Sequence, residues 1–267
     1  MNYKHPLTIQ QQTEYLKEHK RVVYNQISKK EAQEILYTHN YINVITPFKY
    51  RFARKNKKNQ ILRDTNGCHI YDRDVEFSDY SNKYFEEREK YPLLYNAIMK
   101  FESQFNAIVS YEVLVSFNIK NDDDFDDFIK MLYVNIFNLN VSSSAANHMH
   151  NEVSSFKSEL NKYGSPFIFF DRLSLNKLVT VYKACGEDLS DRIFNELLKR
   201  KLTFGNTRKT DFDKILNTLI QIRNCVMHGN SITVLRRYYD VKNKDLRRRE
   251  DRRKYDTLIQ KLYEFGI

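Results

Sequence analysis

Glycine, proline, cysteine and tryptophan are scarce in this 267-residue sequence, which contains 6 Gly, 4 Pro, 3 Cys and no Trp. Turn-rich β-architectures and glycine-rich phosphate-binding α/β folds use more glycine and proline than this, so the composition argues against both. The cysteines, Cys68, Cys185 and Cys225, are odd in number and widely spaced. A disulfide framework and a cysteine-based zinc site are therefore not expected. The cysteines indicate a protein that resides in a reducing compartment.

Long apolar runs are also missing from the sequence. No stretch approaches the 18 consecutive apolar residues of a membrane-spanning helix, and the first residues lack the apolar segment of a secretory signal. The sequence thus predicts a cytoplasmic protein that does not interact with membranes.

Aromatic residues are abundant, with 19 Tyr and 18 Phe, and 41% of all residues are apolar, enough for a sizeable core. Apolar residues recur at intervals of three and four, which predicts an all-α fold. We expect an up-and-down helical bundle over residues 89–235, preceded by an N-terminal helical region (1–88) and followed by a basic C-terminal helix (236–267). The expected helices are 8–24, 28–37, 92–117, 125–137, 152–163, 173–185, 189–201, 212–228 and 245–265.

Positive charge is concentrated in two segments of the chain, whose net charge is +10. Residues 49–63 carry seven basic residues and no acidic one, and residues 236–254 carry ten basic residues and four acidic ones. This segregation favours binding to a phosphate backbone over a solvated lysine-rich surface, which is the alternative. The candidate RNA-binding residues are Lys49, Arg51, Arg54, Lys55, Lys57, Lys58, Arg63, Arg236, Arg237, Arg247, Arg248, Arg249, Arg252 and Arg253.

Two clusters of polar residues resemble metal sites only superficially. The acidic run 121–127 precedes apolar residues at helical spacing, so we interpret it as a helix cap rather than a site for a divalent ion. His148 and His150 lie in a polar stretch without further ligands and are expected at the surface. The sequence thus predicts no metal site.

An arginine followed by a histidine about five to seven residues later occurs twice, at Arg63–His69 and at Arg223–His228. Roughly one such match is expected by chance. The first pair flanks a turn signal at Asn66-Gly67, in a loop or short hairpin that would hold neither side chain rigidly. The second pair ends a predicted core helix, which Gly229-Asn230 terminates.

The second pair has the residue types that acid–base chemistry on a phosphodiester requires. An imidazole such as that of His228 exchanges protons near neutral pH, and the guanidinium of Arg223 can neutralise a transferring phosphoryl group. Asn224 lies four residues before His228, on the same helix face, and can orient either group. The structural alternative is a helix end at which Arg223 pairs with an acidic neighbour and His228 caps the C-terminus.

These residues resemble the signature of HEPN-domain ribonucleases, and the chain resembles their Abi_2 group, the AbiD- and AbiF-like abortive-infection proteins. The matching pieces are 7–12, Asn40-Tyr41 leading to Phe48 and Phe52, Phe101-Glu102 with Asn106, and Arg223-Asn224-x-x-x-His228, which together span most of residues 5–235. Ile42 stands where a second tyrosine is expected, and Cys225-Val226-Met227-His228 replaces the frequent Cys-Ala-His.

The resemblance implies a metal-independent endoribonuclease of a toxin-type phage-defence system, acting through the ribose 2′-hydroxyl and without a cofactor. Since one motif supplies one histidine, a homodimer would bring two together at the scissile phosphate. Glu102 and Asn106 are possible supports of this site or, alternatively, a polar pair at the core edge. The alternative function is a silenced or non-catalytic RNA-binding protein in complex with a structured non-coding RNA.

Overall fold

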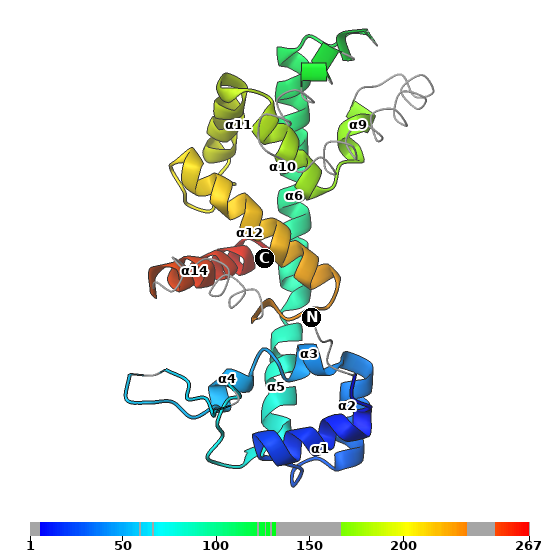
Figure 1. The fold of residues 1–267 in the computed structure, drawn as a ribbon. Helices are drawn as coiled ribbons and strands as arrows, with labels where there is room; N and C mark the ends of the chain where they lie inside the picture. The colour runs from blue at the N-terminus through cyan, green and yellow to red at the C-terminus, as the bar shows by residue number, and fades with distance from the viewer. Residues whose placement is uncertain are drawn as a thin grey trace. The chain divides into compact units, whose positions relative to one another are not determined.

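The structure is a computed structural model that describes residues 6–58, 60–65, 67–121, 123–125, 127–128, 130–131, 167–233 and 249–266. Nearly all regular structure in these residues is helical, which confirms the all-α class (Figure 1). The chain forms two compact units: Met1–Pro92 with Asn224–Asp256, and Leu93–Arg223 with Thr257–Ile267. The division into an N-terminal region (1–88), a bundle (89–235) and a C-terminal helix (236–267) stays a prediction.

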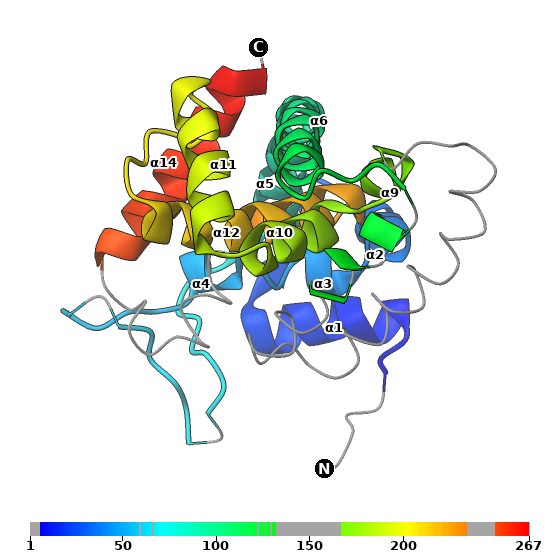
Figure 2. The same cartoon turned by 90° about the horizontal axis from the view of Figure 1, so that it is seen from above.

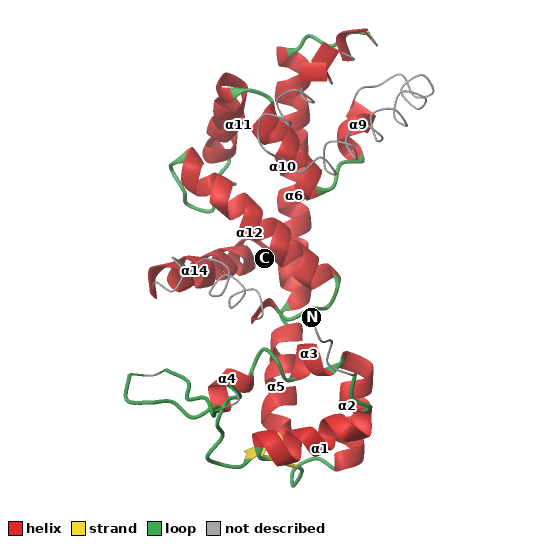
Figure 3. Ribbon diagram, viewed as in Figure 1, coloured by secondary structure: helices red, strands yellow, loops and turns green. Residues whose placement is uncertain are grey.

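Within residues 6–88 of the first unit, the described chain forms five helices and one pair of very short strands (Figure 3). The helices are α1 (Ile9–Lys20), α2 (Lys29–His39), α3 (Tyr41–Val44), α4 (Lys49–Phe52) and α5 (Phe77–Arg88). The strands β1 (Val22–Val23) and β2 (Val75–Glu76) pair in parallel. The core of this unit comprises Leu16, Val22, Ala32, Leu36, Val44, Ile45, Phe48, Val75, Phe77, Tyr80 and Tyr84.

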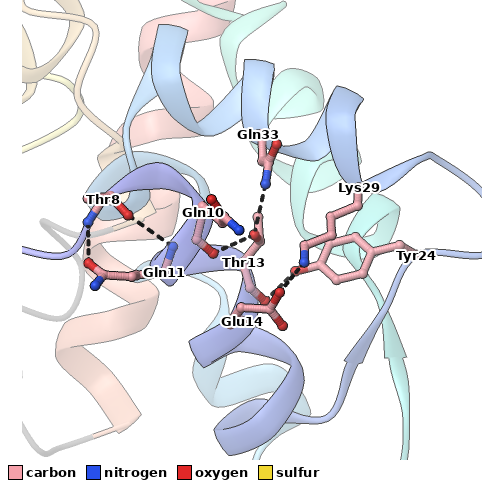
Figure 4. A network of polar contacts seen from close by, with 8 residues as sticks. All are labelled: Thr8, Gln10, Gln11, Thr13, Glu14, Tyr24, Lys29 and Gln33. Carbon is pink, nitrogen blue, oxygen red and sulfur yellow. Dashed lines mark hydrogen bonds and ion pairs between the residues drawn. The ribbon is translucent and has the colours of Figure 1, made fainter.

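Capping boxes fix the starts of α1 and α2. Ser28 and Glu31 form the box predicted for α2, and Thr8 and Gln11 form a second one at α1. The buried hydroxyl of Thr13 then links the two helices, because it donates to the Gln10 carbonyl (2.8 Å) and accepts from the Gln33 amide (3.3 Å) (Figure 4).

The first helix ends earlier than the sequence pattern predicts, at Lys20 instead of Tyr24. Arg21 adopts a left-handed conformation (φ 54°), and the β-branched Val22 and Val23 leave the helix to pair with Val75 and Glu76. The predicted extension to Tyr24 is wrong, since a partner strand more than 50 residues away in the sequence decides the conformation of these valines.

Residues 54–70, which we call the basic arm, form two successive tight turns. Antiparallel bridges join Lys55 to Ile61 and Arg63 to His69, so the segment is hairpin-like, as the turn signal indicated. The expectation that this segment holds neither Arg63 nor His69 rigidly stays a prediction, although each side chain makes a contact. The Arg63 guanidinium donates to the Gly67 carbonyl (2.6 Å), and the His69 ring packs on Tyr50 with 4.7 Å between centroids.

The second unit contains most of the long helix α6 (Tyr91–Ser116), along which Figure 2 is viewed. Phe101 and Phe105 of this helix stack on each other (5.4 Å between centroids) and contact Phe204 and Tyr182. The aromatic residues thus form the core that the composition indicated. The other described helices of this part of the chain are α9 (Phe167–Asp171), α10 (Leu175–Ala184), α11 (Glu187–Lys199), α12 (Lys209–Met227) and α14 (Arg249–Gly266).

Most predicted helices of this region are present, with shifted ends. Helix α12 begins at Lys209, three residues before the predicted start at residue 212. At the acidic segment a helix cap was expected from the aspartates, and the capping side chain is that of Asn121, which accepts from the Asp124 amide (2.9 Å). The predicted helix 152–163, His148, His150 and most of the predicted helix 125–137 lie outside the described residues.

Two features are absent from the described residues. None of their helices has both the length and the apolarity needed to cross a membrane. Nor do three or more of their His, Cys, Asp or Glu side chains gather as metal ligands would.

Candidate active site at the end of helix α12

Helix α12 ends in a tight, fully hydrogen-bonded turn directly at His228. The amide of His228 donates to Asn224 (3.0 Å), that of Gly229 to Val226 (3.2 Å), and that of Asn230 to the Cys225 carbonyl (2.8 Å). With Gly229 at φ 64°, these bonds form a Schellman motif in which His228 is the last, capping residue. The predicted stop at Gly229-Asn230 is therefore confirmed.

A side chain at Gly229 would displace the guanidinium of Arg88. A Cβ atom there would lie 2.9 Å from Nη1 of Arg88, which donates a hydrogen bond to the Gly229 carbonyl (3.2 Å). We expect Gly229→Ala to lower the free energy of unfolding by about 2 kcal/mol, since it combines left-handed strain with displacement of Arg88. Urea denaturation measures this loss.

The control is to introduce Gly229→Ala into the Arg88→Ala variant, in which the close contact with Arg88 is absent. There the cost of Gly229→Ala is expected to fall to the backbone strain alone, about 1 kcal/mol. An equal cost in both backgrounds would show that Arg88 does not restrict this turn.

The side chains of Asn224 and His228 are exposed on the same face of this helix end. In the described part of the protein, neither side chain makes a hydrogen bond or an ion pair. The imidazole is thus open to solvent at the end of a rigid helix, where a substrate can reach it.

Arg223, five residues earlier, faces a different environment. Its side chain is 27% exposed, and its Nε atom lies 3.5 Å from Oε2 of Glu102, whose side chain is 14% exposed. The two residues that the sequence assigned to one site, from α12 and α6, therefore form an ion pair. This pair is also what the structural alternative predicts for Arg223.

Glu102 has a second role, at the start of α10. Its Oε1 accepts a hydrogen bond from the Leu175 amide (2.8 Å), while Ser174, the residue before the helix, makes no side-chain cap. A carboxylate is favourable at this position because the N-terminal end of a helix carries partial positive charge. One carboxylate thus caps α10 and pairs with the charge of Arg223, although Arg223 Nε and Glu102 Oε2 make no hydrogen bond among the described residues.

Asn106 lies one helical turn beyond Glu102 but takes no part in this ion pair. Its amide nitrogen donates to the Phe170 carbonyl (2.8 Å), which ties the end of α9 to α6. This contact agrees with the alternative that Asn106 is a polar residue at the core edge.

The candidate RNA-binding residues of the first unit lie on α4 and on the basic arm. Lys55, Lys57 and Lys58 are exposed and make no ion pair among the residues described, whereas Arg54 lies 3.5 Å from Asp72. Lys49 and Arg51 lie on α4, and Arg63 is exposed on the arm.

The second basic segment is only partly within the described structure. Arg236, Arg237, Arg247 and Arg248 lie outside the described residues, and Arg249, Arg252 and Arg253 belong to the beginning of α14.

Sequence reasoning missed the residues that hold the chain just after His228. Glu87 and Arg88, at the end of α5, and Tyr91 bind Gly229–Thr233 through side-chain hydrogen bonds. No local pattern marks these residues, because their partners lie about 140 positions further along the chain.

Comparison with known proteins gives one match. A family model described as Abi-like protein matches residues 34–233, which is 200 of the 267 residues and includes Glu102, Arg223 and His228. No curated protein and no solved structure matches the chain.

Proposed function

The chain belongs to the Abi-like protein family, and from this premise we propose that it is an endoribonuclease of abortive infection that needs no metal ion. Membership of this family indicates a role in abortive infection, a form of phage defence. The cleavage chemistry is our inference from the residues at the end of α12. The observation that carries it is the exposed imidazole of His228, set on a hydrogen-bonded helix end five residues after a charged, carboxylate-bound Arg223.

Each residue has a role in this reaction. The neutral imidazole of His228 removes the proton from the ribose 2′-hydroxyl, whose oxygen attacks the adjacent phosphorus. The guanidinium of Arg223 stabilises the added negative charge on the phosphoryl oxygens. The bond to the 5′-oxygen of the next nucleotide breaks, leaving a 2′,3′-cyclic phosphate and a 5′-hydroxyl.

The leaving 5′-oxygen needs a proton, and one His228 cannot be both base and acid in the same step. We expect a homodimer in which the imidazolium of the second His228 supplies this proton. Asn224, exposed one turn before His228, is placed to orient the substrate on the same face.

RNA is the substrate class that the basic arm favours. Three exposed lysines, Lys55, Lys57 and Lys58, extend from a paired turn and have no carboxylate partner in the described structure, so they are available to phosphates. The arm gives affinity for the backbone and no base specificity.

The function is tested by incubating the purified protein with RNA in excess EDTA. We expect cleavage that leaves 2′,3′-cyclic phosphate ends, and no cleavage of a substrate with 2′-deoxyribose at the scissile position. Cleavage of the 2′-deoxy substrate, or complete inhibition by EDTA, would contradict the mechanism.

The same observation on the basic arm supports a second candidate function, binding of a structured RNA without cleavage. In this case RNA is retained through purification, remains intact in the assay, and dissociates when Lys55, Lys57 and Lys58 are replaced together by glutamine. Growth of cells that overexpress the protein separates the two functions, because only a nuclease loses its toxicity on His228→Ala.

A further inference from the structure

The side chain of His228 does not hold this residue in place, because it is exposed and makes no polar contact in the described structure. Its place depends on the backbone on either side. Helix α12 fixes the preceding residues. Of the five residues that follow, Gly229–Ser231 lie in no helix or strand, and Ile232 and Thr233 are helical. Something outside this segment must therefore hold it.

The carboxylate of Glu87 is the main support of this segment. Its Oε1 accepts from the Ile232 amide (2.6 Å) and the Tyr91 hydroxyl (2.8 Å). Its Oε2 accepts from the hydroxyls of Thr233 (2.6 Å) and Ser231 (3.1 Å). Four donors on one partly buried carboxylate use nearly all of its acceptor capacity, and three of them come from consecutive residues.

Arg88 and Tyr91 add contacts with the segment, and the Tyr255 hydroxyl donates to the Ile232 carbonyl (3.1 Å). Arg88 binds the Gly229 carbonyl and is itself held by the Tyr84 hydroxyl (2.8 Å), and Tyr91 contacts the Asn230 carbonyl (2.6 Å). Burial, and then the neighbouring Glu87 carboxylate, raise the pKa of Tyr91 well above its usual range, so its hydroxyl remains a donor. Every residue from Gly229 to Thr233 is thus bound by Glu87, Arg88 or Tyr91.

We propose that Glu87 is a positioning residue for catalysis, which holds the Gly229–Thr233 segment and thereby the imidazole of His228. This inference rests on the proposed ribonuclease function. Proton transfer requires the imidazole within hydrogen-bond reach of the 2′-hydroxyl, and a displacement of about 1 Å can reduce a rate about 100-fold. Glu87 itself touches no reacting atom in this scheme.

The test is Glu87→Gln, which preserves size but presents an amide group to the Ile232, Ser231 and Thr233 donors. We expect kcat for RNA cleavage to fall about 10- to 100-fold and KM to stay within about twofold, because the basic arm is unaffected. We also expect backbone amides 230–233 to exchange hydrogen at least about tenfold faster.

A matched control is available in the same unit. Glu76 likewise holds a loop, accepting from the Asn25 amide (3.1 Å), the Asn25 side chain (2.9 Å) and the Gln26 amide (3.3 Å). Glu76→Gln is expected to loosen that loop and leave kcat unchanged. A second pair is Thr233→Val, expected to lower kcat, and Thr233→Ser, expected to restore it by returning the hydroxyl.

The outcomes separate this proposal from the function on which it rests. Unchanged kcat in Glu87→Gln, or an equal fall in Glu76→Gln, overturns the positioning role while the ribonuclease function stands. If the wild-type protein does not cleave RNA, the function fails and the catalytic role of Glu87 fails with it. Hydrogen exchange would in that case still show whether Glu87 holds the segment.

Discussion

Replacing His228 by alanine is expected to lower the rate of RNA cleavage by about two to four orders of magnitude, the usual contribution of a general acid or base. The protein should remain as stable as the wild type, because the imidazole is exposed and makes no polar contact in the described structure. Single-turnover cleavage with saturating RNA measures the effect on the chemical step.

The control for this prediction is His19→Ala, which removes another exposed histidine of the same unit (61% exposed side chain) and is expected to leave cleavage unchanged. Arg223→Lys keeps the positive charge but loses the planar guanidinium, and should also slow cleavage. If His228→Ala cleaves RNA at the wild-type rate, the end of α12 is not the active site.

The largest effect on stability is expected for Glu102→Ala. This change leaves the first amide of α10 without its acceptor, and it leaves the partly buried Arg223 without its counter-ion. A hydrogen bond to a charged group contributes about 1.5–3 kcal/mol, and an unpaired buried charge adds to the loss. We expect the free energy of unfolding to fall by about 3 kcal/mol, measured by urea denaturation.

Two variants of α6 separate the contribution of the Leu175 hydrogen bond from that of the Arg223 ion pair. Glu102→Gln retains an acceptor for the Leu175 amide but no charge for Arg223, so its cost should be intermediate. Glu112→Ala removes a partly buried carboxylate of α6 for which the structure gives no polar partner, and should cost less than about 0.5 kcal/mol. Equal losses for Glu102→Ala and Glu112→Ala would contradict the assigned roles of Glu102.

Local sequence signals predicted the features that local physics determines. Ser28 and Glu31 form a capping box because both partners lie within one turn, and Gly229 ends α12 because glycine readily adopts a positive φ. The turns of the basic arm follow in the same way from residues close in sequence.

Contacts between distant segments could not be predicted from such signals. Val22 and Val23 continue an acceptable helical pattern, and only pairing with Val75 and Glu76 makes them a strand. Likewise, Glu87 is one of several acidic residues near the end of α5, and nothing nearby in the sequence distinguishes it from Glu86 or Glu89. Glu102 was marked only by the family resemblance, and its pairing with Arg223 required the structure.

The two bridges of the basic arm also have a thermodynamic consequence. Fixing the backbone of a flexible loop costs about 1–2 kcal/mol per residue, and a loop that folds on binding loses this amount from its affinity. The arm is already paired at Lys55–Ile61 and at Arg63–His69 in the free protein. If the arm binds RNA as we propose, little further conformational entropy of its backbone is lost on binding.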